Sequence, residues 1–385
     1  MKITAVKSLA LKATFRNIFI VKIETDSGIY GLGESGTASR EKALAGMVDH
    51  FAQFLVGQDP RQIEQIWQTL YRSQYFEGGT VIAAAISAID IALWDILGKT
   101  LDTPIYQLLG GRSRDYVNCF CNAGTLNGPG CVDLARQRVE EGWRTLRFGP
   151  GMPAPPAKED SDNVYEPHES IVLAAHWLKE IRKALGPTIR LSVDFHHRLS
   201  VAETADFCQR AEHVDLMFLE EPIRSENPKA YAALRQMTSM PLAIGEEFSS
   251  KWAFLPYIEE GLTNYARVDL CNVGGFTEAR KVAGWCETHY IDMMPHNPLG
   301  PVCTAASAHF CTAINNFSLQ EFQHTLHEFP RDLFPVQLEL ENDHLLVPDR
   351  PGLGIEFNEE AAADYGFEYD ECPHLFRRDG AYTNW

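Results

Sequence analysis

Three acidic residues recur at a constant interval in the middle of the chain. Asp194, Glu220 and Glu246 are separated by 26 residues each (194 to 220 and 220 to 246), and each ends a short apolar run typical of a buried strand. If such strands stand side by side in a barrel, their carboxyl ends meet on one face, where three carboxylates can bind one hard divalent cation. The alternative is that acidic residues simply end buried strands at solvent. Three in register favour a Mg²⁺ site.

Two histidines are expected close to these carboxylates. His196 follows Asp194 by two residues, so a continuing strand would place both side chains on one face. A histidine satisfied in a polar core is the alternative for His196. On the same strand His197 would point the other way, so it is expected to be a supporting or surface residue. Asp269 and His296 end the next two predicted strands, which would let the carboxylate fix the tautomer of the imidazole and strengthen it as a base. We therefore predict His296 as a general base.

Two further charged residues end predicted strands. Glu321 finishes the last strand and is expected to hydrogen-bond a substrate carboxylate as charge builds on it, although it fits a plain strand-end carboxylate as well. Arg147 ends the second barrel strand. Arginine is a poor proton acceptor, but its guanidinium can hold a carboxylate or a hydroxyl. A salt-bridge partner is the alternative, and the role of Arg147 stays open.

These side chains fit one reaction. A proton alpha to a carboxylate is weakly acidic, and its removal becomes feasible when Mg²⁺ neutralises the enediolate that forms. If His296 takes this proton and His196 protonates a departing hydroxyl on the next carbon, the product is an enol that ketonises. The sequence therefore predicts the dehydration of a polyhydroxy acid to a 2-keto-3-deoxy acid.

Length, charge and cysteine usage limit the class of protein. The 385 residues predict one large barrel and a smaller domain. A net charge of -18 argues against nucleic acid or membrane partners, but a small anionic substrate needs only the local positive charge of Mg²⁺. Nine cysteines without paired spacings indicate reduced thiols. The N-terminal residues lack a signal-peptide core, and no later run is expected to approach the apolar length needed to span a bilayer, so we predict a cytoplasmic protein.

The predicted elements divide the chain into three stretches. Residues 1–114 are expected to form an α+β domain that includes a buried helix over 81–99, and residues 341–385 a segment that returns to it. Strands and helices alternate over 115–340, which indicates a (β/α) barrel. The interval 149–169 is a substrate lid or a solvated insertion. Eight strand positions are predicted, at residues 116–122, 145–148, 189–195, 216–220, 242–246, 266–270, 292–296 and 317–320.

Between these strands lie amphipathic helices. Residues 200–213 form one of them, which begins with the capping-box spacing Ser200-x-x-Glu203, and residues 277–289 form another. Helices that follow buried strands in strict alternation are typical of a barrel rather than of a doubly wound sheet.

The chain resembles the enolase superfamily, mandelate racemase subgroup, and within it the acid-sugar dehydratases. The resemblance implies an α+β capping domain built from both chain ends, a modified TIM barrel of the (β/α)7β type, assembly into homo-oligomers, and Mg²⁺ held by Asp194, Glu220 and Glu246. The segments that carry it are Ala88–Asp95, Asp194–His196, Glu220–Pro222, Gly245–Glu246, Asp269 with His296, and Leu319–Glu321.

Different segments of the chain resemble two kinds of dehydratase. His296–Pro301 is similar to the galactonate dehydratases, whereas Asp194–Leu199, the insertion after Arg147 and the ending 378–385 resemble the mannonate dehydratases. In the second kind an arginine and a tyrosine act in catalysis, which implies such roles for Arg147 and, more loosely, for Tyr165. The second strand lacks the lysine pair of the racemases, so racemisation loses its usual base. We predict a galactonate-type aldonate dehydratase; the alternatives are a mannonate or gluconate dehydratase, an epimerase or racemase, and a noncatalytic sugar-acid-binding relative.

Overall fold

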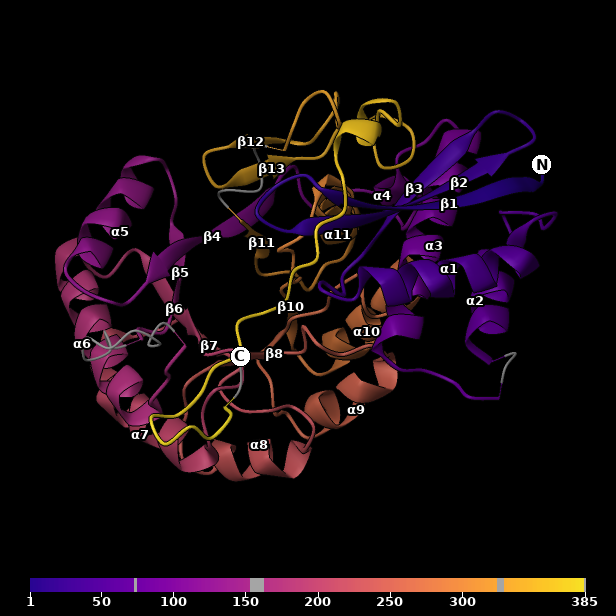
Figure 1. Ribbon diagram of the computed structural model, residues 1–385. Coiled ribbons are helices and arrows are strands. Elements are labelled where there is room, and N and C mark those ends of the chain that lie inside the picture. Colours follow the sequence, from indigo (N-terminus) through magenta and orange to yellow (C-terminus); the bar gives the residue numbers. More distant parts are fainter. Residues whose placement is uncertain (73–74, 153–162, 324–328, 384–385) are drawn as a thin grey trace. The chain divides into compact units, whose positions relative to one another are not determined.

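A computed structural model of the chain describes residues 1–72, 75–152, 163–323 and 329–383 (Figure 1). The chain forms two compact units whose segments alternate along the sequence. The predicted domain boundaries at residues 114/115 and 340/341 stay a prediction. Unit 1 consists of Met1–Asn118, Glu246–Leu255 and Arg267–Asp370, and unit 2 of Cys119–Gly245, Pro256–Ala266 and Glu371–Trp385.

Unit 1 begins with a three-stranded antiparallel sheet in the order β1-β2-β3, followed by three helices. Glycines in β3 let this sheet approach α3 closely, because a Cβ on Gly33 would lie 1.7 Å from the carbonyl oxygen of Ala88. The strands are β1 (Ile3–Lys12), β2 (Asn17–Thr25) and β3 (Tyr30–Ser35), and the helices are α1 (Glu41–Leu55), α2 (Ile63–Arg72) and α3 (Thr80–Thr100).

Helix α3 confirms the predicted buried helix over 81–99. By length and composition alone it is apolar enough to cross a bilayer, so the expectation that no run reaches this length was wrong. However, 78% of its most apolar stretch is buried inside the protein. Because a helix that is apolar on all sides must be covered on all sides, α3 is a core helix of unit 1.

Unit 2 is built on parallel strands. Strands β4 to β9 pair in chain order, and α5 to α8 lie outside them in Figure 1. Strands buried on both faces read as continuous apolar runs, which is why this alternation was visible in the sequence. The strands are β4 (Val117–Thr125, with its first residues in unit 1), β5 (Thr145–Gly149), β6 (Arg190–Asp194), β7 (Phe218–Glu220), β8 (Leu242–Ile244) and β9 (Tyr265–Ala266); the helices are α5 (Gly130–Glu140), α6 (Pro167–Leu185), α7 (Val201–Arg210) and α8 (Pro228–Arg235).

The first turn of α7 confirms the predicted capping box. Ser200 accepts a hydrogen bond from the backbone N–H of Glu203 at 3.3 Å, and the Glu203 carboxylate accepts one from the backbone N–H of Ser200 at 2.7 Å. Two backbone donors that the helix leaves unused are thereby satisfied, which fixes where α7 begins after β6.

Several strands end earlier than predicted. The predicted strands 242–246 and 266–270 shorten to β8 and β9, so Asp269 lies in the loop after β9 rather than at a strand end. The reason is that side-chain acceptors take the backbone donors beyond the ladder. The N–H of Gly245 donates to the carboxylate of Glu221, and the N–H of Cys271 donates to that of Asp269. Burial continues along these segments although the strand pairing stops.

The later part of unit 1 holds the remaining strands and two long helices. Met293 forms a parallel bridge with Phe317, so β10 runs beside the segment that leads into β11. These elements are β10 (Asp292–Met293), β11 (Gln320–Phe322), β12 (Glu339–Glu341), β13 (His344–Leu346), α10 (Gly275–Thr288) and α11 (Pro301–Ala313). Helix α4 (Ile105–Leu108) belongs to the first part of unit 1, α9 (Lys251–Glu259) contributes to both units, and 3-10 turns span Glu212–Val214 in unit 2 and Ala361–Asp364 in unit 1.

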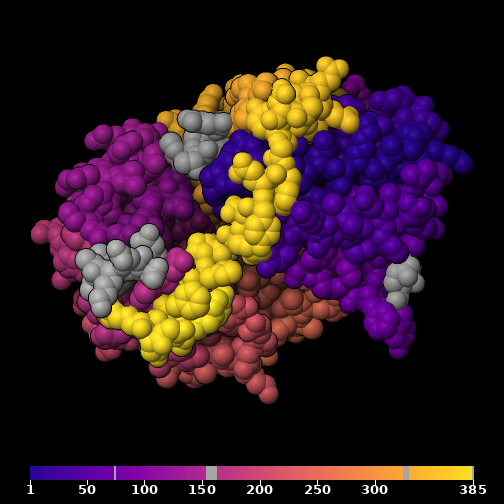
Figure 2. Space-filling view, in the orientation of Figure 1, coloured from indigo at the N-terminus to yellow at the C-terminus, as the bar shows by residue number. Residues whose placement is uncertain are grey.

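The end of the chain lies beside the start of α6 in unit 2. Phe376 accepts a backbone hydrogen bond from Tyr165 at 2.8 Å, and Arg378 forms an ion pair with Glu169. Figure 2 shows the C-terminal segment of the chain in yellow on the visible surface. The predicted lid over 149–169 falls largely on residues 153–162, which lie outside the described residues, as does Trp385.

Candidate active site

The first group of predicted site residues lies in unit 2, at the carboxyl ends of β6 and β7. Asp194 and Glu220 are paired across these strands, and their exposed fractions are 1% and 0%. Arg147 reaches them from β5: its Nη1 donates to Glu220 Oε2 at 3.1 Å and lies 3.5 Å from Asp194 Oδ2. The buried guanidinium of Arg147 therefore offsets the negative charge of two buried carboxylates.

His196 extends this group. Burial alone would raise the pKa of Asp194, but the imidazole of His196 and the guanidinium of Arg147 outweigh burial and hold that pKa below its usual range. His196 Nε2 lies 2.8 Å from Asp194 Oδ2, and its backbone N–H donates to Asp194 Oδ1 at 2.9 Å. The contact was predicted from a continuing strand, and that reasoning was wrong: β6 ends at Asp194, and His196 has a φ of 47°. A left-handed turn brings the ring back to the carboxylate.

His197 and Glu221 form a buried layer behind these side chains. His197 is buried, with Nδ1 3.5 Å from Glu221 Oε2, so it supports the site rather than lying on the surface. Glu221 accepts the backbone N–H of Gly245 at 2.5 Å, and its carbonyl accepts that of His197 at 2.6 Å. Glu221 thus joins the ends of β6, β7 and β8. The sequence signal for it was the adjacent pair Glu220-Glu221, of which only Glu220 was predicted as a site residue.

The second group lies in unit 1 and contains the predicted dyad. His296 Nδ1 lies 2.7 Å from Asp269 Oδ2. An ionised carboxylate only accepts hydrogen bonds, so Nδ1 carries the proton and Nε2 is left to take another. Asp269 also accepts hydrogen bonds from the backbone of Cys271 at 2.7 Å and from the side chain of Asn272 at 3.1 Å. Its orientation is therefore fixed, and His296 Nε2 lies 4.0 Å from Glu246 Oε1.

Glu321 is held by an arginine that the sequence analysis missed. Arg267 is fully buried, and its Nη2 donates to Glu321 Oε2 at 2.5 Å. Its Nη1 donates to the carbonyls of Met294 and Pro295, both at 3.0 Å, and Nη2 lies 4.0 Å from Glu246 Oε2. The available signal was a lone charge inside an apolar run, since Arg267 follows β9 directly.

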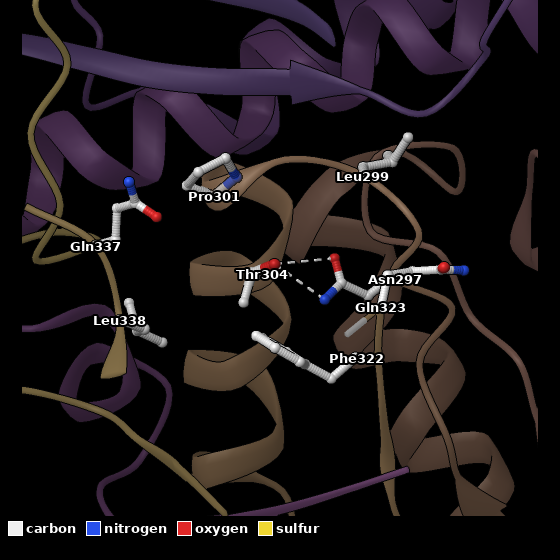
Figure 3. A pocket seen from close by; sticks show the side chains of 8 residues that line it. All are labelled: Asn297, Leu299, Pro301, Thr304, Phe322, Gln323, Gln337 and Leu338. Carbon is white, nitrogen blue, oxygen red and sulfur yellow. Dashed lines mark hydrogen bonds between the residues drawn. The ribbon is translucent and has the colours of Figure 1, made fainter. Parts of the chain in front are cut away.

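A small cavity lies beside Glu321 (Figure 3). Its wall includes Asn297 and Thr304, whose side chains face each other and hydrogen-bond at 3.0 Å, and Gln323, which donates to Glu321 Oε1 at 3.2 Å. The cavity measures about 20 Å³, which is room for about one water molecule. The Gln323 side chain on its wall holds Glu321, and the cavity itself is far too small for a sugar acid.

A second missed residue, Glu34, holds the segment that follows His296. Glu34 is fully buried at the end of β3 and accepts the backbone N–H groups of Gly300 at 2.7 Å and Cys303 at 2.9 Å, at the start of α11. Burial raises its pKa to about 7. Asp90, from the segment Ala88–Asp95, does the same for α10 by accepting the backbone N–H of Thr277 at 3.2 Å. Both carboxylates tie the N-terminal part of unit 1 to helices that follow site loops.

Tyr165 is the most loosely predicted residue. Its ring is fully buried, and the guanidinium of Arg198 lies 5.4 Å from the ring centroid. Burial raises the pKa of Tyr165 to about 12, so the phenol keeps its proton near neutral pH.

Asp194, Glu220 and Glu246 form a candidate carboxylate triad for a metal ion. Glu246 follows Gly245 directly, so chain continuity places it just beyond β8, which pairs with β7. The donor set consists of carboxylate oxygens alone, and all three residues are buried, with exposed fractions of 1%, 0% and 9%. Three buried negative charges and hard oxygen donors suit Mg²⁺. The residues present therefore fit such an ion.

Comparison with known protein families shows to which superfamily the chain belongs. Residues 7–110 match the mandelate racemase / muconate lactonizing enzyme N-terminal domain, and residues 130–361 match the enolase C-terminal domain-like family. The chain is therefore a member of the enolase superfamily. This confirms the predicted fold class: an N-terminal capping domain of three strands plus helices and a barrel-like C-terminal α/β domain.

Individual relatives show to which group of enzymes within the superfamily the chain belongs. A D-galactonate dehydratase family member from Marinomonas sp. (strain MWYL1) is 36% identical, with 100% of both chains covered. A D-mannonate dehydratase from Sphingomonas sp. (strain SKA58) is 33% identical over 96% of both. The crystal structure of an enolase from Pantoea ananatis with bound D-gluconate and Mg is 30% identical, with a TM-score of 0.91, and covers 100% of this chain and 99% of that one. The chain belongs to the D-galactonate dehydratase family of acid-sugar dehydratases, which are hydro-lyases.

Proposed function

We propose that this dehydratase converts a galactonate-type aldonate to its 2-keto-3-deoxy acid through an enediolate. The observation that carries the proposal is the 2.7 Å contact of His296 Nδ1 with the fully buried Asp269, which leaves Nε2 as a base. Mannonate and gluconate are the alternative substrates, because one relative is a D-mannonate dehydratase and another binds D-gluconate. The substrate is a small anion in each case.

Each residue has a defined part in the proposed reaction. His296 Nε2 removes the alpha proton, and His196 donates its own proton to the departing hydroxyl on the next carbon, which leaves as water. Glu321, whose Oε2 accepts a hydrogen bond from Arg267, interacts with the substrate carboxylate as charge develops there. The guanidinium of Arg147, which pairs with Asp194 and Glu220, limits the repulsion between these ligands.

Mg²⁺ is the proposed cofactor, held by Asp194, Glu220 and Glu246. When bound, it would neutralise negative charge on the enediolate. The support consists of the all-carboxylate donor set and of the Mg in the relative that binds D-gluconate. A cytoplasmic location and assembly into homo-oligomers stay predictions, as does the absence of nucleic-acid and membrane partners, for which the net charge of -18 is the argument.

The test is 2-keto-acid formation from galactonate, mannonate and gluconate, each with Mg²⁺ and with a chelator. Chelator-sensitive turnover of galactonate is expected, and turnover of mannonate or gluconate alone would replace galactonate as the substrate. Exchange of the alpha proton with solvent deuterium without keto acid would identify an epimerase instead. The matched control is His289→Asn, an exposed histidine at the end of α10, which should turn over like the wild type. Silence across a wider panel of acids would favour the noncatalytic alternative.

A further inference from the structure

Two buried thiols lie against the carboxylate of the dyad. Cys271 follows Asp269 by two residues, and Cys303 lies in the first turn of α11. All three side chains have exposed fractions of 0%. One oxygen of Asp269 and the two sulfurs lie within 4.8 Å of one another. The proposed dehydration uses Asp269 but neither thiol, so the two sulfurs have no part in the function argued above.

The donor types of this cluster differ from those of the Mg²⁺ triad. Thiolate sulfur binds borderline-soft cations such as Zn²⁺ and Cd²⁺, whereas Mg²⁺ selects oxygen. We propose that Asp269, Cys271 and Cys303 form a second metal site, specific for a borderline-soft divalent cation, whose occupation inhibits the enzyme by competing with His296 for Asp269.

The backbone around the cluster is already fixed. Asp269 Oδ1 accepts the N–H of Cys271 at 2.7 Å, and Glu34 accepts the N–H of Cys303 at 2.9 Å. Both sulfurs are therefore carried by anchored residues, and ligand positions that exist before binding reduce the ordering cost of binding.

The charges favour a cation once the thiols ionise. Burial comes first among the causes that raise the pKa of both thiols, that of Cys303 to about 12, and the acidic Asp269 and Glu34 beside them act in the same direction. Binding breaks two S–H bonds, forms two metal–sulfur bonds and releases two protons. Two thiolates and the Asp269 carboxylate then carry three negative charges against the two positive charges of the ion.

Occupation of this site would act on the base. Asp269 Oδ2 accepts hydrogen bonds from His296 at 2.7 Å and from Asn272 at 3.1 Å. A cation that draws on this carboxylate weakens its hold on the imidazole, so His296 loses the group that fixes its tautomer. This inhibitory step rests on the proposed function, whereas the binding of the cation does not.

The binding test uses Cd²⁺, because cadmium–thiolate bonds absorb in the near ultraviolet. The full chain carries Cys372→Ser, which removes the one exposed cysteine among the described residues, and excess Mg²⁺ is present throughout. One Cd²⁺ per chain is expected, with an absorbance that is lost in Cys303→Ala and in Cys271→Ser. The control Cys286→Ala removes a thiol equally buried, in α10, and should keep the absorbance. No cadmium–thiolate band in the parent chain, or a band that survives both cluster variants, would overturn the site.

The activity test addresses inhibition separately. With Mg²⁺ saturating, Cd²⁺ should inhibit keto-acid formation. Cys303→Ala removes one of the three proposed ligands and should raise the inhibitory concentration by about tenfold or more, because losing even an outer-shell partner weakens metal binding by roughly 10- to 100-fold. Full activity with the site occupied would refute the coupling to His296. If no acid is turned over at all, the proposed function fails while the absorbance measurement still decides the metal site.

Discussion

Arg147 provides a direct test of the proposed Mg²⁺ triad. Its guanidinium lies 3.1 Å from Glu220 and 3.5 Å from Asp194, so it competes with the ion for the same two carboxylates. The Arg147→Met variant lacks this competing guanidinium, so the carboxylates of Asp194 and Glu220 have no positive partner. Mg²⁺ should therefore bind more tightly. A hydrogen bond to a charged group contributes about 1.5–3 kcal/mol. If the ion displaces one such contact, at about 1.4 kcal/mol per tenfold, the dissociation constant should fall roughly 10- to 150-fold.

The assay is calorimetric titration of Mg²⁺ into the protein without substrate, so the result does not depend on turnover. Arg147→Lys keeps the positive charge and should stay close to the wild-type affinity. The control Arg138→Met removes a partly buried arginine of the same unit that pairs with Glu141 instead, and it should change nothing.

Two results would refute this reasoning. An unchanged affinity in Arg147→Met would mean that the ion does not use Asp194 and Glu220. A weaker affinity would mean that Arg147 supports the bound form, for example by orienting Glu220, rather than competing with the ion. Equal effects of the Met and Lys variants would indicate that shape, and not charge, decides.

Three further predictions concern single side chains. His296→Asn should abolish keto-acid formation while Mg²⁺ affinity stays unchanged by calorimetry, and substantial residual turnover would remove His296 from the base role. Glu220→Gln should weaken Mg²⁺ binding by at least about 100-fold, because a charged ligand is lost, and wild-type affinity would mean the ligand set is wrong. Burial lowers the pKa of His309 from 6.5 to about 4, so its contribution to stability is complete above pH 6.5 and is lost as the pH falls toward 4. His309→Gln removes this titration, and the stability difference between wild type and variant in urea unfolding should shrink by about 2 kcal/mol between pH 8 and pH 5, which is 1.5 pH units at about 1.4 kcal/mol each; a constant difference would contradict it.

The sequence predicted the strand-end carboxylates for a simple physical reason. Parallel strands are buried on both faces, so polar side chains gather at their carboxyl ends, and a repeated interval reports which ends are neighbours. The interval from Asp194 to Glu220 matches their direct pairing across β6 and β7. The contact between Asp269 and His296 was predicted in the same way, although both residues lie in loops beyond the shortened strands.

The contacts of the supporting residues could not be predicted, because their partners leave no pattern in the sequence. Glu34 accepts hydrogen bonds from backbone N–H groups, which every non-proline residue carries. The partner of Arg267, Glu321, is 54 residues away, and no interval relates the two. The turn at His196 has a positive φ, but no glycine stands at this position to indicate the turn in the sequence. Hydrophobic spacing reports where strands are buried, whereas these contacts depend on how the loops close.

The interleaving of the two units sets the order in which the chain can fold during synthesis. In unit 1, Lys7 and Lys22 of the first sheet pair with Glu359 at 2.8 Å and 2.5 Å, and Lys7 precedes that glutamate by 352 residues. At a translation rate of about 5–20 residues per second, roughly 20–70 s pass before the partner leaves the ribosome. During that time the sheet lacks its C-terminal partner. Strands β1 to β3 are therefore the part of the nascent chain that chaperones can bind for the longest time.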